Sequence, residues 1–435
     1  MPTASRLPPA HPERVALHNE IHARPPERMS APLAISHVVM TCDAGEREAS
    51  RAHLAGLLRE RHLPMPDEST LHLRMDLGAF RLRWELHTEF VTWTFLRPLD
   101  GVPAATAGAP PLTALDALPA EWLEGLPGRL LVASHLWALP VGPSQADDLL
   151  RAWLHEDTLV GSGVAGGEGA AYTDFAVHAD GFSRIVLLAG ALSDRRLGRT
   201  VQRLLEVETY RMAALLGLPA GRSSAGALGN AERELAGLAE AIRSAERHDE
   251  PQLLDRLTRL AAQVESQYAT THSRFSASAA YFELIDKRIA DLAETRLGSL
   301  QTLGEFLERR LSPARSTCAW VMRRQEALSQ RVSRVSNLLR TRVEIEQQQS
   351  SQAVLTAMNT RQDLQLKLQA TVEGLSVAAI TYYIVGLVGY VAKGAQKGGW
   401  AVNPEIATAV AIPVVALCVW LLIRRLHNRI TAGKS

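Results

Sequence analysis

The chain has 435 residues, with 47 Lys plus Arg against 46 Asp plus Glu and a formal net charge of +1. At about 150 residues per domain, this length predicts two or three structural units. The balanced charge excludes the bulk basicity of a general nucleic-acid binder, and an aromatic content of 5% argues against a base-stacking surface. Cys42, Cys318 and Cys418 are too far apart in sequence to predict a disulfide framework or a cysteine-based zinc site. The balanced charge and the low aromatic content together predict that the protein has no nucleic-acid partner.

Residues 1–190 predict a cytoplasmic α+β domain, because this stretch lacks the apolar core of a secretory signal and alternates β-rich runs with two amphipathic helices. The expected helices are 46–62 and 144–155. The expected strands are 33–40, 70–77, 80–87, 90–96, 130–139, 171–178 and 183–188. Neighbouring runs joined as hairpins predict a mostly antiparallel sheet. One face of its second and third strands is apolar, and the other carries His72, Arg74, Arg81, Arg83 and Glu85.

Residues 191–312 predict a helical region, because Ala, Leu, Glu and Arg recur there at helical spacing. We expect helices at 193–216, 230–248, 250–272 and 275–297. Between the first two, the run Gly221 to Gly226 is the best candidate linker in the chain.

Residues 313–374 predict one long stalk helix, since no Gly or Pro interrupts 314–373. Its apolar residues Leu328, Val332, Val335 and Leu339 step by the 4-3-4 spacing of a coiled-coil seam. If the helix continues into the apolar segment after it, its ~80 residues reach about 120 Å. The partner of this seam is either an earlier helix of the chain or another subunit.

Two uncharged runs near the C-terminus, 375–392 and 406–423, predict a transmembrane hairpin in the lipid bilayer, joined by a short extracytoplasmic turn at 393–405. Asn403, Pro404 and Glu405 read as the start of the second helix. The outer flanks, including the basic tail 424–435, carry six Lys or Arg against two in the turn. This bias predicts a two-pass protein of the bacterial inner membrane with both termini in the cytoplasm. The alternative is a pair of buried core helices.

The densest polar cluster in the sequence is the box His18 to Pro26. On a helix, His18 and His22 would lie one turn apart, a spacing that metals can use. The order is HxExH rather than the HExxH of zinc proteases, so a metal here is a weak candidate. The alternative is that the box ties the N-terminal segment to the sheet through its polar residues, which include Asn19, Glu20 and Arg24, ahead of Pro25.

Residues 161–166 match GxGxxG literally, but a glycine-rich run and a β-like segment follow instead of a helix. A dinucleotide site needs the helix N-terminus, so a hairpin or loop is expected. No Walker motif, GxSxG elbow or Cys/His nucleophile pair is present in the sequence. We therefore predict neither a cofactor nor an enzymatic activity.

Three motifs carry a resemblance to a bacterial family of uncharacterised membrane-anchored proteins. They are Asn-Glu-Ile-His-Ala-Arg-Pro at 19–25, Thr-Asp-Phe at 173–175 with His-Ala-Asp-Gly-Phe-Ser-Arg at 178–184, and the apolar hairpin from Ile380 to Ala407. The resemblance spans nearly the whole chain. It implies a membrane location but no activity.

The order of elements is also similar to that of CorA-type divalent-cation channels, which are pentamers with a Gly-Met-Asn signature after the first span. This chain has Gly389-Tyr390-Val391 there, and Lys393 and Lys397 would repel cations. One hypothesis is a homo-oligomeric channel for a divalent cation, with pore-lining candidates Glu373, Ser376, Thr381, Tyr382 and Gly386. The alternative is a membrane-anchored cytoplasmic sensing or scaffold protein without transport activity.

Overall fold

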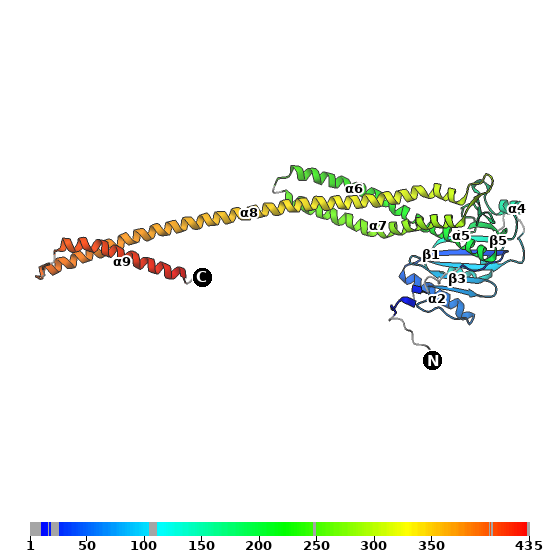
Figure 1. The fold of residues 1–435 in the computed structure, drawn as a ribbon, viewed down its shortest axis with the longest axis horizontal. Coiled ribbons are helices and arrows are strands. Elements are labelled where there is room, and N and C mark those ends of the chain that lie inside the picture. Colours follow the sequence, from blue (N-terminus) through cyan, green and yellow to red (C-terminus); the bar gives the residue numbers. More distant parts are fainter. Residues whose placement is uncertain are drawn as a thin grey trace, which may run out of the picture. The chain divides into compact units, whose positions relative to one another are not determined.

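The computed structural model describes residues 10–15, 17–18, 26–103, 111–246, 249–399, 401 and 403–432 (Figure 1). The chain divides into two compact units, Met1–Ser336 and Asn337–Ser435. The first unit contains a sheet covered by helices. The described residues of the second unit form helices joined by a short turn.

The sheet of the first unit has nine described strands in the order β2-β3-β4-β1-β5-β8-β7-β6-β9. Their bounds are β1 Leu33–Thr41, β2 His72–Asp76, β3 Arg81–Leu86, β4 Phe90–Pro98, β5 Arg129–Leu139, β6 Val160–Val164, β7 Gly169–Thr173, β8 Ser183–Leu188 and β9 Thr295–Arg296. Among these strands, β5 and β8 pair in parallel and the other neighbours are antiparallel. The predicted α+β domain with a mostly antiparallel sheet is therefore confirmed.

Helices α2 (Ala44–Glu60) and α4 (Pro143–Trp153) cover one face of this sheet. Helix α2 begins with a capping box, in which Asp43 accepts from the Glu46 backbone N–H and Glu46 accepts from the Asp43 backbone N–H. Its Leu54 and Leu58 are buried in one cluster with Trp93 of β4. The short helix α3 (Ala120–Glu124) lies beside the same cluster. This face of the sheet is mostly apolar, as alternation in the strands predicts, with Ser36, His135 and Arg184 as buried polar residues near its centre.

Helix α5 (Asp194–Leu215) covers the opposite face, whose character changes across the sheet. Near β5 and β8 the face is apolar, and Leu136 and Ile185 are buried in one cluster with Val201 and Leu204 of α5. Toward β3 and β4 the same face carries Arg83 and other polar side chains, which matches the predicted polar face. The second face therefore combines an apolar core with a polar end.

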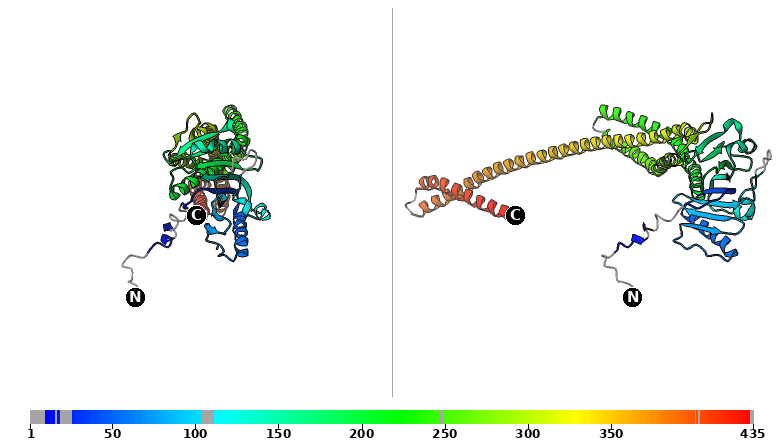
Figure 2. Two further views of the ribbon diagram at one scale, coloured as in Figure 1. Left: turned by 90° about the vertical axis from the view of Figure 1, so that its right-hand side faces the viewer. Right: turned by 45° about the vertical axis from the view of Figure 1, so that its right-hand side comes forward.

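Helices α6 (Gly217–Ser244), α7 (Glu250–Leu292) and the first part of α8 (Leu303–Lys397) lie side by side in the first unit (Figures 1 and 2). The prediction of a linker at 221–226 is wrong, because these residues belong to α6. A Cβ at Gly221 would lie 3.6 Å from Thr317 and 3.8 Å from Phe275. Gly221 therefore lies in a helix interface, whereas Gly226 is exposed, and a local glycine and serine signal cannot distinguish such a helix from a linker.

The long helices differ from their predicted bounds. The predicted break between 272 and 275 is absent, and α7 continues to Leu292, where Ala293 ends it in a left-handed conformation with φ 47°. Helix α8 begins at Leu303, ten residues before the predicted start, and includes Pro313. Its Leu328 and Val332 are buried, and Arg324 forms an ion pair with Glu232 of α6. In the first unit, the partners of the predicted seam are thus helices of the same chain.

The second unit contains the C-terminal part of α8 and α9 (Pro404–Ala432). The two helices pack through small and apolar side chains: Val385 and Ala392 are buried, and a Cβ at Gly389 would lie 3.4 Å from the Thr408 hydroxyl. Asn403 accepts from the Glu405 backbone N–H at 3.1 Å, as expected of the N-cap. The prediction of a turn at 393–405 is too long, because α8 continues to Lys397.

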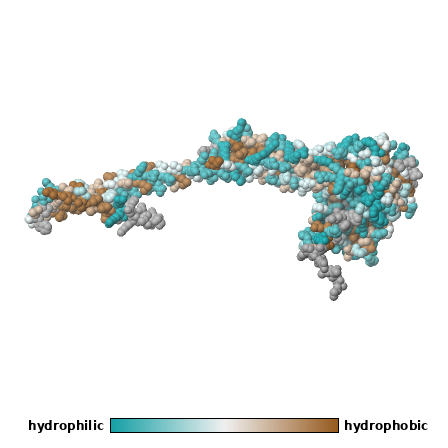
Figure 3. Space-filling view, in the orientation of Figure 1, coloured by the Kyte–Doolittle hydropathy of each residue, from teal (hydrophilic) through white to brown (hydrophobic). Residues whose placement is uncertain are grey.

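In the described part of the chain, two helices, α8 and α9, are long and apolar enough to cross a membrane. Their apolar stretches are 17% and 6% buried. Figure 3 shows this hydrophobic surface in brown over the C-terminal part of α8 and over α9. A core helix of a globular domain would be mostly buried, so the alternative of two buried core helices is disfavoured.

Candidate functional site

A cavity of about 250 Å³ lies at the polar end of the sheet, between the strands and helices α5 and α7. Most of its lining side chains are polar or charged. They are His37, Arg83, Glu85, His87, Phe90, Thr92, Thr94, Gln202, Leu205, Glu206, Thr209, Tyr210 and Arg288. We call this space the polar cavity.

Strand register brings the charged side chains to the polar cavity. In β3, Arg83 and Glu85 are two residues apart and point to the same face, opposite Thr94 and Thr92 of β4. Arg83 Nη2 donates to Glu85 Oε1 at 2.7 Å, and both residues are 7% exposed. Burying both charges is costly, and their direct hydrogen bond offsets part of that cost.

His37 connects the sheet to α5 at the wall of the polar cavity. The Thr209 hydroxyl donates to the Leu205 carbonyl at 2.9 Å, so it accepts from His37 Nε2–H at 3.0 Å. His37 Nδ1 then accepts from the Thr94 hydroxyl at 2.8 Å. Burial and the nearby Arg83 guanidinium lower the pKa of His37 to about 3. The imidazole is therefore neutral, with its proton on Nε2.

Three buried polar atoms of the cavity lining have no hydrogen-bond partner among the described residues. They are Arg83 Nε, Thr92 Oγ1 and Gln202 Oε1. The first is a donor, the third is an acceptor, and the hydroxyl can be either. Buried polar groups are nearly always satisfied by protein or by ordered water, so these three atoms mark positions where water or a polar ligand can bind in the cavity. On the helix side, Arg288 forms an ion pair with Glu206.

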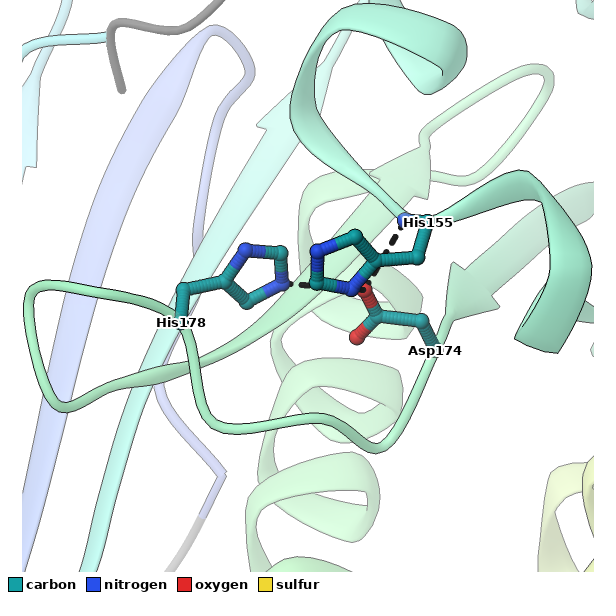
Figure 4. Close-up of side chains that lie close together, drawn as sticks. All are labelled: His155, Asp174 and His178. Carbon is teal, nitrogen blue, oxygen red and sulfur yellow. Dashed lines mark hydrogen bonds and ion pairs between the residues drawn. The ribbon is translucent and has the colours of Figure 1, made fainter.

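A second group of side chains, the His–Asp–His cluster, consists of His155, Asp174 and His178 (Figure 4). His155 Nδ1 lies 3.0 Å and His178 Nε2 lies 2.9 Å from the same Asp174 oxygen, Oδ2. The two imidazole rings stack, with centroids 4.5 Å apart and planes 4° apart. The Asp174 side chain is 0% exposed and that of His155 is 59% exposed. The cluster is therefore buried at the Asp174 carboxylate and open to solvent at His155.

Local turns hold the cluster in place. Asp174 follows β7 directly, and its Oδ1 accepts from the Ala176 backbone N–H at 3.1 Å. Phe175, at φ 52°, turns the chain away from the strand, and its N–H donates to the Thr173 hydroxyl. The prediction that this strand extends to 178 is therefore wrong: it ends at Thr173, because side-chain hydrogen bonds replace the ladder there.

Residues 178–184, the second half of the sequence motif, hold the loop that follows Asp174 in place. Arg184 of β8 forms an ion pair with Asp180 at 2.9 Å and donates to the carbonyl of Trp153 at 3.1 Å, in the segment that leads to His155. Burial, opposed by Asp174, lowers the pKa of His178. The motif residues Asp174 and His178 are thus brought together by the fold.

The predicted pore-lining residues do not share one face of α8. Glu373, Ser376 and Thr381 are partly buried in the second unit, and the Ser376 hydroxyl donates to the Val372 carbonyl at 2.8 Å. Tyr382 and Gly386 are exposed, and a Cβ at Gly386 would meet no atom within 4 Å. Of the five candidates, Tyr382 and Gly386 are therefore the two that remain exposed within one chain.

The residues of the N-terminal box, Asn19, Glu20, His22, Arg24 and Pro25, lie outside the described residues. His18 is described and exposed, but the predicted pairing of His18 with His22 stays a prediction. The run 161–166 forms the β6–β7 hairpin, as expected. A Cβ at Gly163 would lie 2.1 Å from the Thr295 hydroxyl, so this glycine admits β9.

Sequence reasoning missed His155 and the polar cavity. A lone histidine after an amphipathic helix carries no signal of its own, and its ligand-like neighbours are about 20 residues away in sequence. The polar face of β2 and β3 was the available signal for the cavity. That face predicted polar strands but not the side chains of α5 and α7 that enclose them.

Comparison with known proteins gives a family without an activity. The model of a family described as a protein of unknown function, DUF3422, matches residues 9–430. No curated protein and no solved structure matches the chain. The match confirms the predicted resemblance to an uncharacterised family over nearly the whole chain.

Proposed function

Since the chain belongs to the DUF3422 family of unknown function, we propose its role from its own geometry: a membrane-anchored protein that binds a small zwitterionic molecule in the polar cavity. The N-terminal unit would sense this molecule, and the C-terminal hairpin would tether the unit to the membrane. The proposal includes no catalytic step. It develops the sensing alternative over the channel.

One observation carries this proposal: the polar cavity contains an unsatisfied buried donor, Arg83 Nε, and an unsatisfied buried acceptor, Gln202 Oε1. A ligand that satisfies both must bring an acceptor and a donor. Charges of both signs line the same space, in the pairs Arg83–Glu85 and Arg288–Glu206. A carboxylate and an ammonium group on one small molecule match this lining, as in the amino-acid class.

The membrane part of the proposal rests on the exposed apolar stretches of α8 and α9. Six Lys or Arg flank them on the outer sides against two in the connection. This bias supports a two-pass protein of the bacterial inner membrane with both termini in the cytoplasm. The polar cavity would then be exposed to cytoplasmic metabolites.

The test is ligand-induced stabilisation of the full-length protein in detergent, with the free amino acids as probes. A ligand at a hundred times its Kd should stabilise the folded unit by about 2.7 kcal/mol. Thr92→Val removes the unsatisfied cavity hydroxyl at constant shape, so we expect it to weaken binding by about tenfold without loss of stability.

The matched control is Ser134→Ala. Ser134 also has a buried hydroxyl without a partner among the described residues, but it does not line the polar cavity. We expect this variant to bind as the wild type does. Equal binding by Thr92→Val and wild type, or no stabilisation by any amino acid, would contradict the proposal.

A second candidate, the homo-oligomeric CorA-like channel for a divalent cation, is favoured by Tyr382 and Gly386. They are one turn apart on the exposed face of α8, where several subunits could place them around a pore. This candidate requires a closed ring of subunits, whereas the anchor does not.

A further inference from the structure

We propose that the His–Asp–His cluster is a binding site for a divalent transition-metal ion of the zinc class, held by His155 Nδ1, Asp174 Oδ2 and His178 Nε2. This site is separate in its residues from the polar cavity, so it does not depend on the proposed function. Two imidazoles, one carboxylate and an open fourth position are a donor set that zinc uses in proteins.

The distances fit a tetrahedral ion. With zinc bonds of about 2.0 Å, neighbouring ligand atoms of a tetrahedron are about 3.3 Å apart. In the cluster, two of the three separations are 3.0 and 2.9 Å, and all three are within 4.8 Å. Two of the three separations are therefore already close to tetrahedral spacing.

The charge of the cluster also favours a cation. Asp174 Oδ2 faces three nitrogens at once, the two imidazole nitrogens and the His155 backbone N–H at 3.0 Å. A metal ion would replace the two imidazole–carboxylate contacts with three bonds, one to Asp174 Oδ2 and one to each imidazole, with the proton of each neutral ring moved to its other nitrogen.

One movement is needed. The stacked rings are nearly parallel, so one ion cannot lie in both ring planes. His155 can rotate to correct this, because its side chain is 59% exposed, whereas Asp174 and His178 are held by the loop. Bound metal would then connect the segment after α4 to the β7–β8 loop.

The experiment is zinc(II) titration of the full-length, metal-stripped protein by calorimetry, with cobalt(II) absorption as a probe of tetrahedral coordination. We expect saturable binding of one ion per chain. His155→Gln removes an exposed ligand and leaves the buried loop intact, so we expect zinc affinity to fall at least about tenfold. Asp174→Asn should abolish the cobalt spectrum.

The matched control is His62→Asn, which removes an exposed histidine outside the cluster and outside the N-terminal box. This variant should bind zinc as the wild type does. The site is overturned if the wild type shows no saturable binding, or if His155→Gln keeps wild-type affinity. Asp174→Asn could fail to fold, but His155→Gln, checked by circular dichroism, still decides the outcome.

Discussion

At the scale of single residues, the first unit keeps two histidines neutral inside its sheet. His37 is bonded to Thr94 and Thr209, and His135 Nδ1 lies 2.8 Å from the Ser36 hydroxyl. The His135 ring also stacks on Phe182, with centroids 4.0 Å apart. Burial lowers the pKa of His37 to about 3 and that of His135 to about 4.

These pKa values predict that the unit loses stability in mild acid. A folded-state pKa below the ordinary 6.5 means that the unfolded chain binds the proton first as the pH falls. The stabilisation is complete above 6.5, and each histidine removes up to about 1.4 kcal/mol per pH unit below that value. Urea unfolding, followed by near-ultraviolet circular dichroism from about pH 7.5 to pH 5, measures this slope.

Variant His37→Gln separates the contribution of His37. It should be less stable at neutral pH by about 1–3 kcal/mol, because the Thr94 hydroxyl loses its acceptor. Its stability should depend less steeply on pH than that of the wild type. The control is His62→Asn, since His62 is exposed at φ 56°, where asparagine is tolerated. An unchanged slope in His37→Gln would contradict the burial argument.

At the scale of elements, the N-terminal segment packs closely against α5 because Gly198 of α5 has no side chain. A Cβ at Gly198 would lie 1.7 Å from the Glu27 carbonyl oxygen. In the same place, the Met29 N–H donates to the Asp194 carbonyl at 3.1 Å, and Glu27 forms an ion pair with Arg81 of β3. Gly198 thus allows this segment to cross α5 at the polar end of the sheet.

Two glycine-to-alanine variants should therefore have opposite effects. Gly198→Ala forces the segment away from α5, and we expect a loss of about 1–3 kcal/mol in the free energy of unfolding. Gly226→Ala lies on the exposed side of α6 with no atom within 4 Å of the added Cβ, so helix propensity should give a gain of about 0.5–1 kcal/mol. Urea unfolding of both variants tests this, and equal stabilities would contradict it.

At the scale of the whole molecule, the number of subunits separates the two candidate functions. In the second unit, α8 exposes a run of large apolar side chains before its membrane-length stretch, namely Val354, Met358, Leu364 and Leu368. Exposed apolar residues in such a series favour association. We expect a homo-oligomer with few subunits, and the proposed membrane-anchored function requires no more than two subunits.

Light scattering of the detergent-solubilised full-length protein, corrected for bound detergent, should therefore give a dimer. The test of this cause is the double variant Val354→Gln and Met358→Gln. Loss of these two exposed apolar side chains should shift the protein toward the monomer. A closed ring of about five subunits would instead favour the channel, and cation flux in liposomes would then test Gly386→Leu as a block of the pore.

The sequence by itself determined the features that depend on neighbouring residues. Alternation in 80–87 and 90–96 predicted strands with one apolar and one polar face, and the uncharged runs near the C-terminus predicted two helices of membrane length. These patterns are local, because side-chain direction repeats every two residues in a strand and every 3.6 in a helix. The start of α8 and the role of Gly221 were missed, because both depend on packing.

Only the tertiary structure decided where chemistry is concentrated. Arg83 and Arg288 line the same cavity although more than 200 residues separate them, and His155 meets Asp174 across a strand hairpin. No local pattern in the sequence predicts these neighbours, because strand order and register place the side chains. The physical reason is that local sequence sets the direction of a side chain, whereas the packing of sheet and helices sets its neighbours.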